Sequence, residues 1–464
     1  PCLCSFSPTI LNLVDSFLSR RPPGWHRPAA DGGTHARAPS RLMSSTFDEA
    51  DGPEEPWSYR NILALAPMVR VNTLPFRLLA REYGANVVYS EELVDKSVMQ
   101  CRRSENAALG TIDFRHDSGK LIFSTVPHER VAFQLGTASA GDALRAAQVV
   151  CADVRAIDVN MGCPVKFSVQ GGMGAALLSK PELVKDILST LVRNLPGVPV
   201  TCKIRLLDSP HDTLQLARAI QETGVAALAV HGRRRNDRPR WWAQWDQIAL
   251  LRQQLGPELP LLPNGDVFLP EHVRGAREAT GCDSLMLARG AMWNASLFGA
   301  PEAELRPQRE VVARYVALCR RYDTYFGNAK YVIMSMLEGH GKTETYKQLQ
   351  KATDLGGLER AAAAMQADPG FAQPYRVPMA LEPAPDLLRE AVSHPVNAWR
   401  TIPPHVRVHL QRQAVQPPAK RPFAQLSEAS PPGEPAPAQE ERVQLRAAEA
   451  EAEGEAENSA AAEL

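Results

Sequence analysis

The feature that most constrains the fold is a regular alternation of short apolar runs and amphipathic runs between Ile62 and Arg289. The apolar runs have the length of strands. Most are followed by a segment with apolar residues at i, i+3, i+4 and i+7, the spacing of an amphipathic helix. Almost wholly apolar strands that alternate with helices predict a parallel sheet buried on both faces. The expected strands are residues 62–68, 86–93, 130–136, 156–162, 198–206, 227–233, 259–265 and 284–289.

Eight such units in roughly 230 residues fit a (β/α)8 TIM barrel, which typically needs about 250 residues. A doubly wound open sheet is the alternative, but no GxGxxG motif follows the first strand, which disfavours a dinucleotide-binding sheet. The alternation ceases after Asn294, and residues 307–367 have the pattern of consecutive helices. We therefore predict an α/β barrel over residues 57–300 and a small all-helical domain over 301–368.

Both ends of the chain are expected to lie outside this fold. Residues 369–464 are rich in proline and then in alanine and glutamate, a composition that predicts a disordered Pro-rich and acidic tail. Residues 1–56 are interpreted as disordered, as a targeting segment, or as an extension ahead of a start at Met43, and we favour the extension. A cytoplasmic location is accordingly expected, with a mitochondrion or another organelle as the alternative.

The formal net charge of zero conceals two parts of opposite sign. Residues 422–464 contain ten acidic and two basic side chains, so the rest of the chain carries a net charge of +8. A basic body suits a partner rich in phosphate. Scattered cysteines without a CxxC pair indicate a reduced, intracellular protein, and no apolar run is long enough to predict a membrane span. No metal site and a monomeric state are expected.

Candidate site residues stand where the predicted strands end, because barrel active sites form at the carboxyl ends of the strands. The NGD run at 264–266 and the Ala288-Arg289 pair end the last two strands, and glycine with arginine there suits a phosphate group. Lys203 and His231 add cationic or hydrogen-bonding groups. Cys163 follows a strand and opens a glycine-rich loop, which suits either a nucleophile or a proton donor.

These strand ends carry motifs that resemble the tRNA-dihydrouridine synthase family. The motifs are LAPMVR (65–70), QLG (134–136), VNMGCP (159–164), KIR (203–205), AVHGR (229–233) and LPNGDV (262–267). SEEL (90–93), GGMGAALL (171–178) and RGAMWN (289–294) resemble the eukaryotic branch that modifies position 20 of tRNA. The resemblance covers about residues 60–340.

The resemblance implies an oxidoreductase that uses NADPH or NADH to reduce FMN and then reduces a tRNA uridine to 5,6-dihydrouridine. Such an enzyme extrudes the uridine from the folded tRNA. Cys163 matches the family's proton donor. The positions that match the family's FMN contacts are Pro67, Met68, Val69, Gln134, Asn160, Lys203, His231, Asn264, Gly265, Asp266, Ala288 and Arg289.

The resemblance has one departure, because animal members of this branch carry a C-terminal double-stranded-RNA-binding domain. Residues 370–464 lack its α-β-β-β-α pattern. Capture of tRNA is therefore assigned to Arg102, Arg103, Arg320 and Arg321 and to the run RRRNDRPRWW (233–242). Two alternatives stay open at this point: an FMN barrel acting on a small molecule such as dihydroorotate or a dihydropyrimidine, and a non-catalytic RNA-binding protein.

Overall fold

Eight parallel strands pair in the order in which they occur in the chain, and the first strand pairs with the last. Leu63 of the first strand is in register with Leu285 of the last, so the sheet closes and the predicted (β/α)8 barrel is confirmed over the open-sheet alternative. The barrel strands are β1 (Leu63–Leu65), β2 (Val87–Tyr89), β7 (Val131–Gly136), β8 (Ala156–Met161), β9 (Val200–Leu206), β10 (Ala227–Arg234), β11 (Leu261–Asn264) and β12 (Leu285–Leu287).

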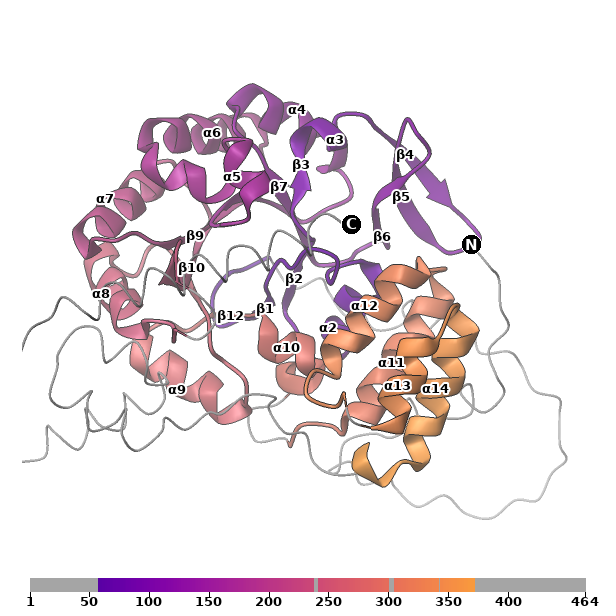
Figure 1. Ribbon diagram of the computed structural model, residues 1–464. Helices are drawn as coiled ribbons and strands as arrows, with labels where there is room; N and C mark the ends of the chain where they lie inside the picture. The colour runs from indigo at the N-terminus through magenta and orange to yellow at the C-terminus, as the bar shows by residue number, and fades with distance from the viewer. Residues whose placement is uncertain (1–56, 238–240, 300–303, 342, 372–464) are drawn as a thin grey trace, which may run out of the picture. The chain divides into compact units, whose positions relative to one another are not determined.

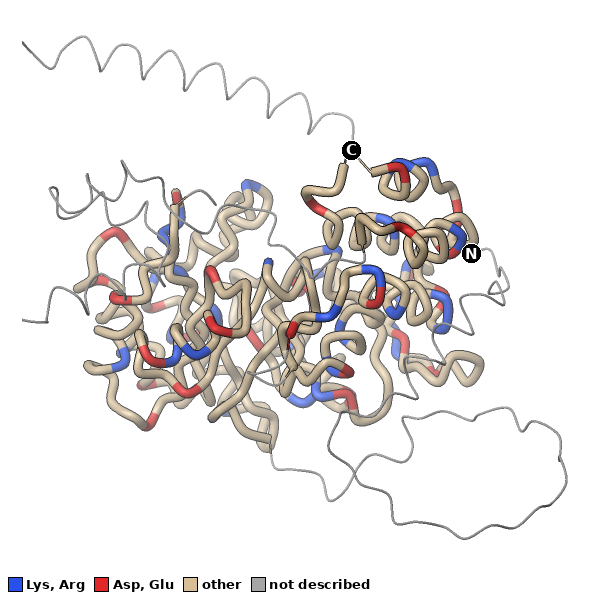
Figure 2. Tube along the Cα trace, turned by 90° about the horizontal axis from the view of Figure 1, so that it is seen from below, with Lys and Arg blue, Asp and Glu red and all other residues tan. Residues whose placement is uncertain are grey.

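This arrangement is seen in a computed structural model, which describes residues 57–237, 241–299, 304–341 and 343–371 (Figure 1). The interpretations of residues 1–56 and of the tail beyond residue 371 lie outside the described residues. Within the described ranges no helix is both long and apolar enough to cross a membrane. Basic and acidic residues are interspersed along the traced chain in Figure 2.

Helices cover the outside of the barrel and follow the strands as the sequence pattern predicts. Ser139 and Ser209 cap two of these helices, each accepting a hydrogen bond from a backbone N–H in the first turn. Proline occupies the first turn of four helices, one of which is the helix capped by Ser209, and its missing N–H costs nothing there. The helices are α2 (Leu74–Glu82), α4 (Ala140–Val150), α6 (Pro181–Asn194), α7 (Pro210–Gln221), α8 (Trp245–Leu255), α9 (Pro270–Thr280) and the short α10 (Arg289–Trp293).

The strands bury both faces, which explains why their sequences are nearly continuous apolar runs. One set of side chains packs outward against the helices. The opposite set fills the barrel interior, where small alanines such as Ala64, Ala132 and Ala229 lie with Tyr59 and Tyr89.

An insertion between β2 and β7 forms a second, antiparallel sheet. The sheet comprises β4 (Cys101–Asn106), β5 (Thr111–His116) and β6 (Leu121–Thr125). The insertion also contains α3 (Asp95–Val98) and β3 (Leu93–Val94), which pairs in parallel with β7. In the turn between β5 and β6 the His116 N–H donates to the Lys120 carbonyl. Strand β4 was not predicted, because its sequence CRRSEN is polar and lies at the edge of the sheet.

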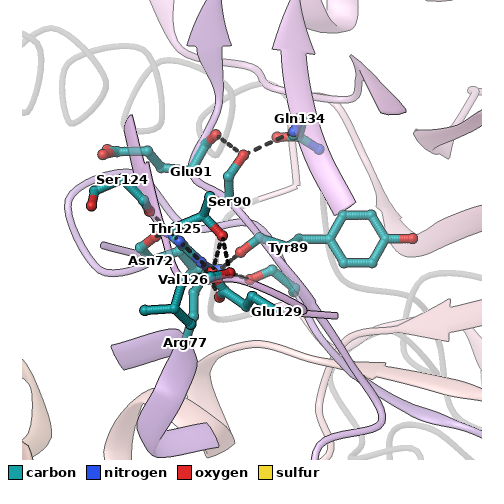
Figure 3. Close-up of polar contacts among 11 residues, drawn as sticks. Asn72, Arg77, Tyr89, Ser90, Glu91, Ser124, Thr125, Val126, Glu129 and Gln134 are labelled. Carbon is teal, nitrogen blue, oxygen red and sulfur yellow. Dashed lines mark hydrogen bonds and ion pairs between the residues drawn. The ribbon is translucent and has the colours of Figure 1, made fainter. Parts of the chain in front are cut away.

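A buried ion pair ties this insertion to the barrel (Figure 3). The Arg77 Nε of α2 lies 2.8 Å from the Glu129 Oε1, and both side chains are almost completely buried. Arg77 also donates to the Ser124 carbonyl of β6 and to the Asn72 carbonyl, and the Thr125 hydroxyl donates to Glu129. The charges are thus paired and hydrogen-bonded, as buried charges must be.

Four helices follow the barrel among the described residues, and Figure 1 shows them gathered beside α2 and α10. They pack directly on the barrel: Arg314 pairs with Glu82 of α2, and the Tyr315 ring meets Phe76 edge to face. Trp293 of α10 donates to Glu338 at 2.7 Å. The helices are α11 (Gln308–Arg321), α12 (Phe326–Met336), α13 (Glu344–Lys351) and α14 (Leu355–Ala367).

Candidate active site

The barrel brings the predicted polar residues together at the carboxyl ends of its strands. Strand pairing places Asn160 in register with Lys203, and His231 in register with Asn264. Gln134 lies one strand further along, where its backbone N–H donates to the Ser90 hydroxyl. Residues spread over more than a hundred positions of the chain therefore line one end of the barrel.

A chain of amide hydrogen bonds orients the strand-end residues on β7 and β8. The Asn160 Nδ2 donates to the Gln134 Oε1 at 3.2 Å, and the Gln134 Nε2 donates to the Asp158 Oδ2 at 2.7 Å. The Asn160 Oδ1 accepts from the backbone N–H groups of Gly162 and Cys163. Asn160 therefore fixes the turn that places Cys163 beyond the strand.

Sequence reasoning missed Asp158, which is completely buried below this network. Burial raises its pKa to about 6, although hydrogen bonds from Thr201 and Gln134 and the charge of Lys203 oppose the rise. The signal was available, because an aspartate in the middle of the apolar run AIDVNM has to find partners inside the barrel.

Cationic and imidazole side chains gather on the neighbouring strands. The pKa of Lys203 falls to about 7 through burial and the charge of Arg205. The pKa of His231 lies well below its usual value, because desolvation of the half-buried ring and the charges of Arg205, Lys203, Arg233 and Arg289 disfavour its protonated form. Basic side chains this close together lower one another's pKa values, and an anionic ligand would relieve their repulsion.

His231 is thus neutral, and its hydrogen bond fixes which ring nitrogen holds the proton. The Arg233 Nη1 lies 3.1 Å from the His231 Nε2. Because a guanidinium only donates, Nε2 accepts and Nδ1 carries the proton. Within the described part of the chain the Lys203 ammonium has no hydrogen-bond or ion-pair partner, so it is available to a ligand.

Asp266 supplies negative charge to the arginines of this group. Its side chain accepts from the Arg233 Nη2 at 2.7 Å, from the Arg289 Nη2 at 2.8 Å and from the Ala243 backbone N–H at 2.6 Å. A carboxylate would repel a phosphate, so the Asp266 side chain positions the arginines. Within the described ranges the Asp266 backbone N–H has no acceptor, which fits a phosphate contact.

Cys163 is half-buried at the start of the loop that contains α5 (Lys166–Gln170) and the 3-10 turn η1 (Gly174–Ser179). Burial raises the pKa of its thiol, and the nearby Glu92 carboxylate raises it further. The thiol is therefore protonated at neutral pH. This favours the proton-donor interpretation over the nucleophile, because only a thiolate attacks well. Cys202, Cys282 and Cys319 are buried, whereas Cys151 is only partly buried.

The remaining predicted contacts lie around the same end of the barrel. Pro67 and Met68 are half-buried in the turn after β1, and Val69 is exposed there. Ala288 lies between β12 and α10, and the Asn264 Nδ2 donates to the Met286 carbonyl at 2.8 Å.

Two residues predicted to contact RNA lie instead in the interior. Arg233 is buried against Asp266, and Trp242 is buried with Phe268 and Trp293. Arg102 and Arg103 on β4 are exposed and paired with nearby carboxylates, and the tip of the run, residues 238–240, lies outside the described residues. The run therefore belongs in part to the anion site, which its local composition did not reveal.

Fold and site together define a (β/α)8-barrel enzyme with an anion-binding carboxyl end and a protonated cysteine beside it. The sequence model of the dihydrouridine synthase (Dus) family matches residues 64–363. The chain belongs to this family.

Named relatives agree with the family. Over 320 residues the chain is 37% identical to the tRNA-dihydrouridine(20) synthase [NAD(P)+] of Schizosaccharomyces pombe, covering 64% of this chain and 66% of that protein. Over 302 residues it is 35% identical to the Saccharomyces cerevisiae protein of the same name, covering 61% of this chain and 78% of that protein. The chain is 30% identical to a human tRNA-dihydrouridine(20a/20b) synthase [NAD(P)+]-like protein over 248 residues, 51% of this chain and 70% of that protein.

Within the described ranges no group of three or more His, Cys, Asp or Glu side chains is arranged to hold a metal ion.

Proposed function

We propose that this chain reduces a uridine of tRNA to 5,6-dihydrouridine, with NADPH or NADH as the reductant. Membership of the dihydrouridine synthase family and the names of the two yeast relatives support the reaction. Both yeast names specify position 20, which we propose as the target here. We also propose that the enzyme acts in the cytoplasm.

The observation that carries the proposal is the excess of cations at the carboxyl end of the barrel. Three cationic side chains lie near His231, those of Lys203, Arg205 and Arg289. Within the described residues, Arg289 is hydrogen-bonded to one carboxylate, that of Asp266. FMN fits this set, since it brings a phosphate and a ring system that gains negative charge on reduction. When bound, FMN supplies the hydride for the uracil C6.

The residues proposed to hold FMN divide into two groups. The Asp266 backbone amide next to Gly265, with Arg289 and the adjoining Ala288, suits the phosphate. Hydrogen-bonding and apolar groups at the other strand ends suit the ring system. That second group comprises Pro67, Met68, Val69, Gln134, Asn160, Lys203, His231 and Asn264.

Cys163 is proposed to give its thiol proton to the uracil C5. Addition of hydride at C6 leaves negative charge on C5 and the adjacent carbonyl, so a proton donor must lie next to C5. The raised pKa of Cys163 keeps that proton on Sγ until the acceptor forms. A partly buried thiol also limits loss of the proton to bulk water.

Replacing Cys163 with alanine in the full-length protein tests this role. We expect dihydrouridine formation to fall by roughly 10²- to 10⁴-fold, the usual contribution of a general acid. Flavin absorbance should stay at the wild-type level. Cys151→Ala is the matched control, because Cys151 lies at the end of α4, outside the site. Unchanged activity in Cys163→Ala would refute the proton-donor role.

Mapping dihydrouridine in tRNA tests the reaction and its position. Purified enzyme with NADPH should restore dihydrouridine at position 20 of tRNA from a strain that lacks the modification. Product at another position would move the assignment within tRNA. Reduction of free uracil or of orotate, without product in tRNA, would overturn the proposal in favour of a small-molecule reductase.

A further inference from the structure

A carboxyl group lies directly beside Cys163, and the reaction outlined above does not use it. The Glu92 carboxyl lies next to the Cys163 thiol, and the two groups interact through their charges and through the thiol proton. The Ser168 hydroxyl of α5 donates to the Glu92 Oε1 at 3.2 Å. Glu92 comes from the segment between β2 and β3, so three separate parts of the chain meet at the thiol.

The surrounding backbone is built to allow this meeting. A Cβ on Gly136 would lie 2.7 Å from the Glu92 Oε1. A Cβ on Gly174, whose φ is +57°, would lie 2.5 Å from the Ser168 Oγ and 3.0 Å from the Cys163 Cβ. No other residue fits at either position without displacing the carboxyl, the hydroxyl or the thiol.

The segment that carries Glu92 is also held in place. Strand β3 adds to the end of β7, with Leu93 in register with Leu135. Just beyond it, the Thr137 hydroxyl donates to the Asp95 Oδ2 at 2.7 Å. The Glu92 carboxyl is therefore fixed against the end of β7 and not carried on a free loop.

The charged groups around the thiol come from two sides. Glu92 is mostly buried, and burial raises the pKa of its carboxyl, against the hydrogen bonds from Cys163 and Ser168. On the side of β9, the charges of Lys203 and Arg205 interact with Cys163. Lys203 and Arg205 stabilise a thiolate by charge, whereas Glu92 lies next to the sulfur.

We propose that Glu92 returns a proton to the Cys163 sulfur after each turnover, and that Ser168 positions its carboxyl for this transfer. The inference rests on the proposed function. When Cys163 gives its proton to C5, the S–H bond breaks and a C–H bond forms, which leaves a thiolate. The Glu92 carboxylate then takes up a proton from solvent and passes it as the O–H proton to Sγ, which restores both the thiol and the carboxylate.

The physical reason is the repulsion between two like charges. A thiolate beside a carboxylate in a partly buried site is unfavourable, so loss of the thiol proton drives proton uptake by Glu92. The proton then sits next to the sulfur that needs it. Glu92 is thus a residue that acts through Cys163 and not on the uracil.

A first test measures the coupling without any activity. Full-length protein is treated with iodoacetamide over a range of pH, and alkylation of Cys163 is followed by mass spectrometry of its peptide. In Glu92→Gln, loss of the negative neighbour should shift the midpoint to lower pH by about half a unit or more. Glu182→Gln, on the exposed first turn of α6, is the matched control. An unshifted profile in Glu92→Gln would overturn the inference.

A second test separates return of the proton from its first transfer. In Glu92→Gln, a single turnover by enzyme whose flavin is already reduced should run within about twofold of wild type, because the thiol starts protonated. Under multiple turnover, kcat should fall by about tenfold or more while the KM for tRNA stays within about twofold. Ser168→Ala should show the same pattern, more weakly.

The outcomes distinguish this inference from the proposed function. If Glu92→Gln slows the single turnover as much as multiple turnover, Glu92 acts before or during proton donation. If multiple turnover by Glu92→Gln is as fast as in wild type, Glu92 is not needed. Either result overturns the inference. If wild-type protein forms no dihydrouridine, the proposed function fails, while the alkylation profile still reports whether Glu92 and Cys163 are coupled. Flavin content of each variant confirms that it is folded.

Discussion

The interaction of Asp266 with two arginines gives the sharpest prediction about stability. The Asp266 side chain is fully buried and the Arg233 side chain nearly so, while Arg289 keeps 30% of its side-chain surface. Replacing Asp266 with asparagine preserves its shape but removes the negative charge. Both arginines then lose their carboxylate at once.

The expected cost follows from the burial of the partner left behind. Removing one member of a buried ion pair usually costs about 3–5 kcal/mol, because the remaining charge stays buried without compensation. Arg233 stays buried when the carboxylate charge is removed and keeps its hydrogen bonds to the Trp241 carbonyl and to His231, whereas Arg289 can turn toward water. We therefore expect Asp266→Asn to lower the free energy of unfolding by about 3 kcal/mol, with most of the loss due to Arg233.

Urea unfolding of the protein without flavin measures this loss, since a bound ligand would add its own stabilisation. Glu222→Gln is the matched control, because it removes an exposed ion pair with Lys185. An exposed pair contributes about 0–1 kcal/mol, so this control should unfold almost as the wild type does.

A second measurement tests the cause of the loss. Added sulfate should stabilise Asp266→Asn more than it stabilises wild type, because an anion can take the place of the missing carboxylate between the arginines. A loss no larger than that of Glu222→Gln, or equal stabilisation of both proteins by sulfate, would refute the idea that Asp266 compensates buried positive charge.

Three further predictions concern other groups. Binding of FMN at pH 8 should be accompanied by proton uptake, because an anionic ligand raises the pKa of Lys203 from about 7. Calorimetry in buffers of different ionisation enthalpy measures this uptake, and Lys203→Met should abolish it. Gly174→Ala should lower stability by about 1 kcal/mol or more in urea unfolding, since its φ is +57° and the new methyl group meets the Ser168 hydroxyl. Glu129→Gln should cost about 3 kcal/mol and speed hydrogen exchange in β4–β6, because Arg77 loses its buried partner; unchanged exchange would contradict this.

The barrel could be predicted because its signals are local. Each strand is an apolar run of a few residues, and each covering helix has a period that a short window reveals. Strand β4 was missed because the same reasoning reads the exposed run Cys101–Asn106 as a loop. Its pairing with β5 is set by the hairpin context and not by its own hydrophobicity.

The site was predictable only as far as residue type and strand position go. Arg233 and Trp242 were misread as a surface, because their partners, Asp266 and Phe268, lie about two dozen or more residues further along the chain. Nothing near residue 233 indicates that a carboxylate will meet it. Likewise, Glu92 and Ser168 are 76 positions apart, and only barrel closure brings them to the same thiol.

The two acidic residues of the site explain how a cationic barrel end can also hold a proton donor. Cations alone would stabilise the thiolate of Cys163 and so lower the pKa of the thiol. Cys163 would then be deprotonated and could not act as the proton donor. Asp266 engages Arg233 and Arg289 on one side, and Glu92 opposes Lys203 and Arg205 at the sulfur itself. The positive charge needed for an anionic ligand and the protonated thiol needed for the uracil are therefore compatible, because each carboxylate acts on a different part of the same cluster.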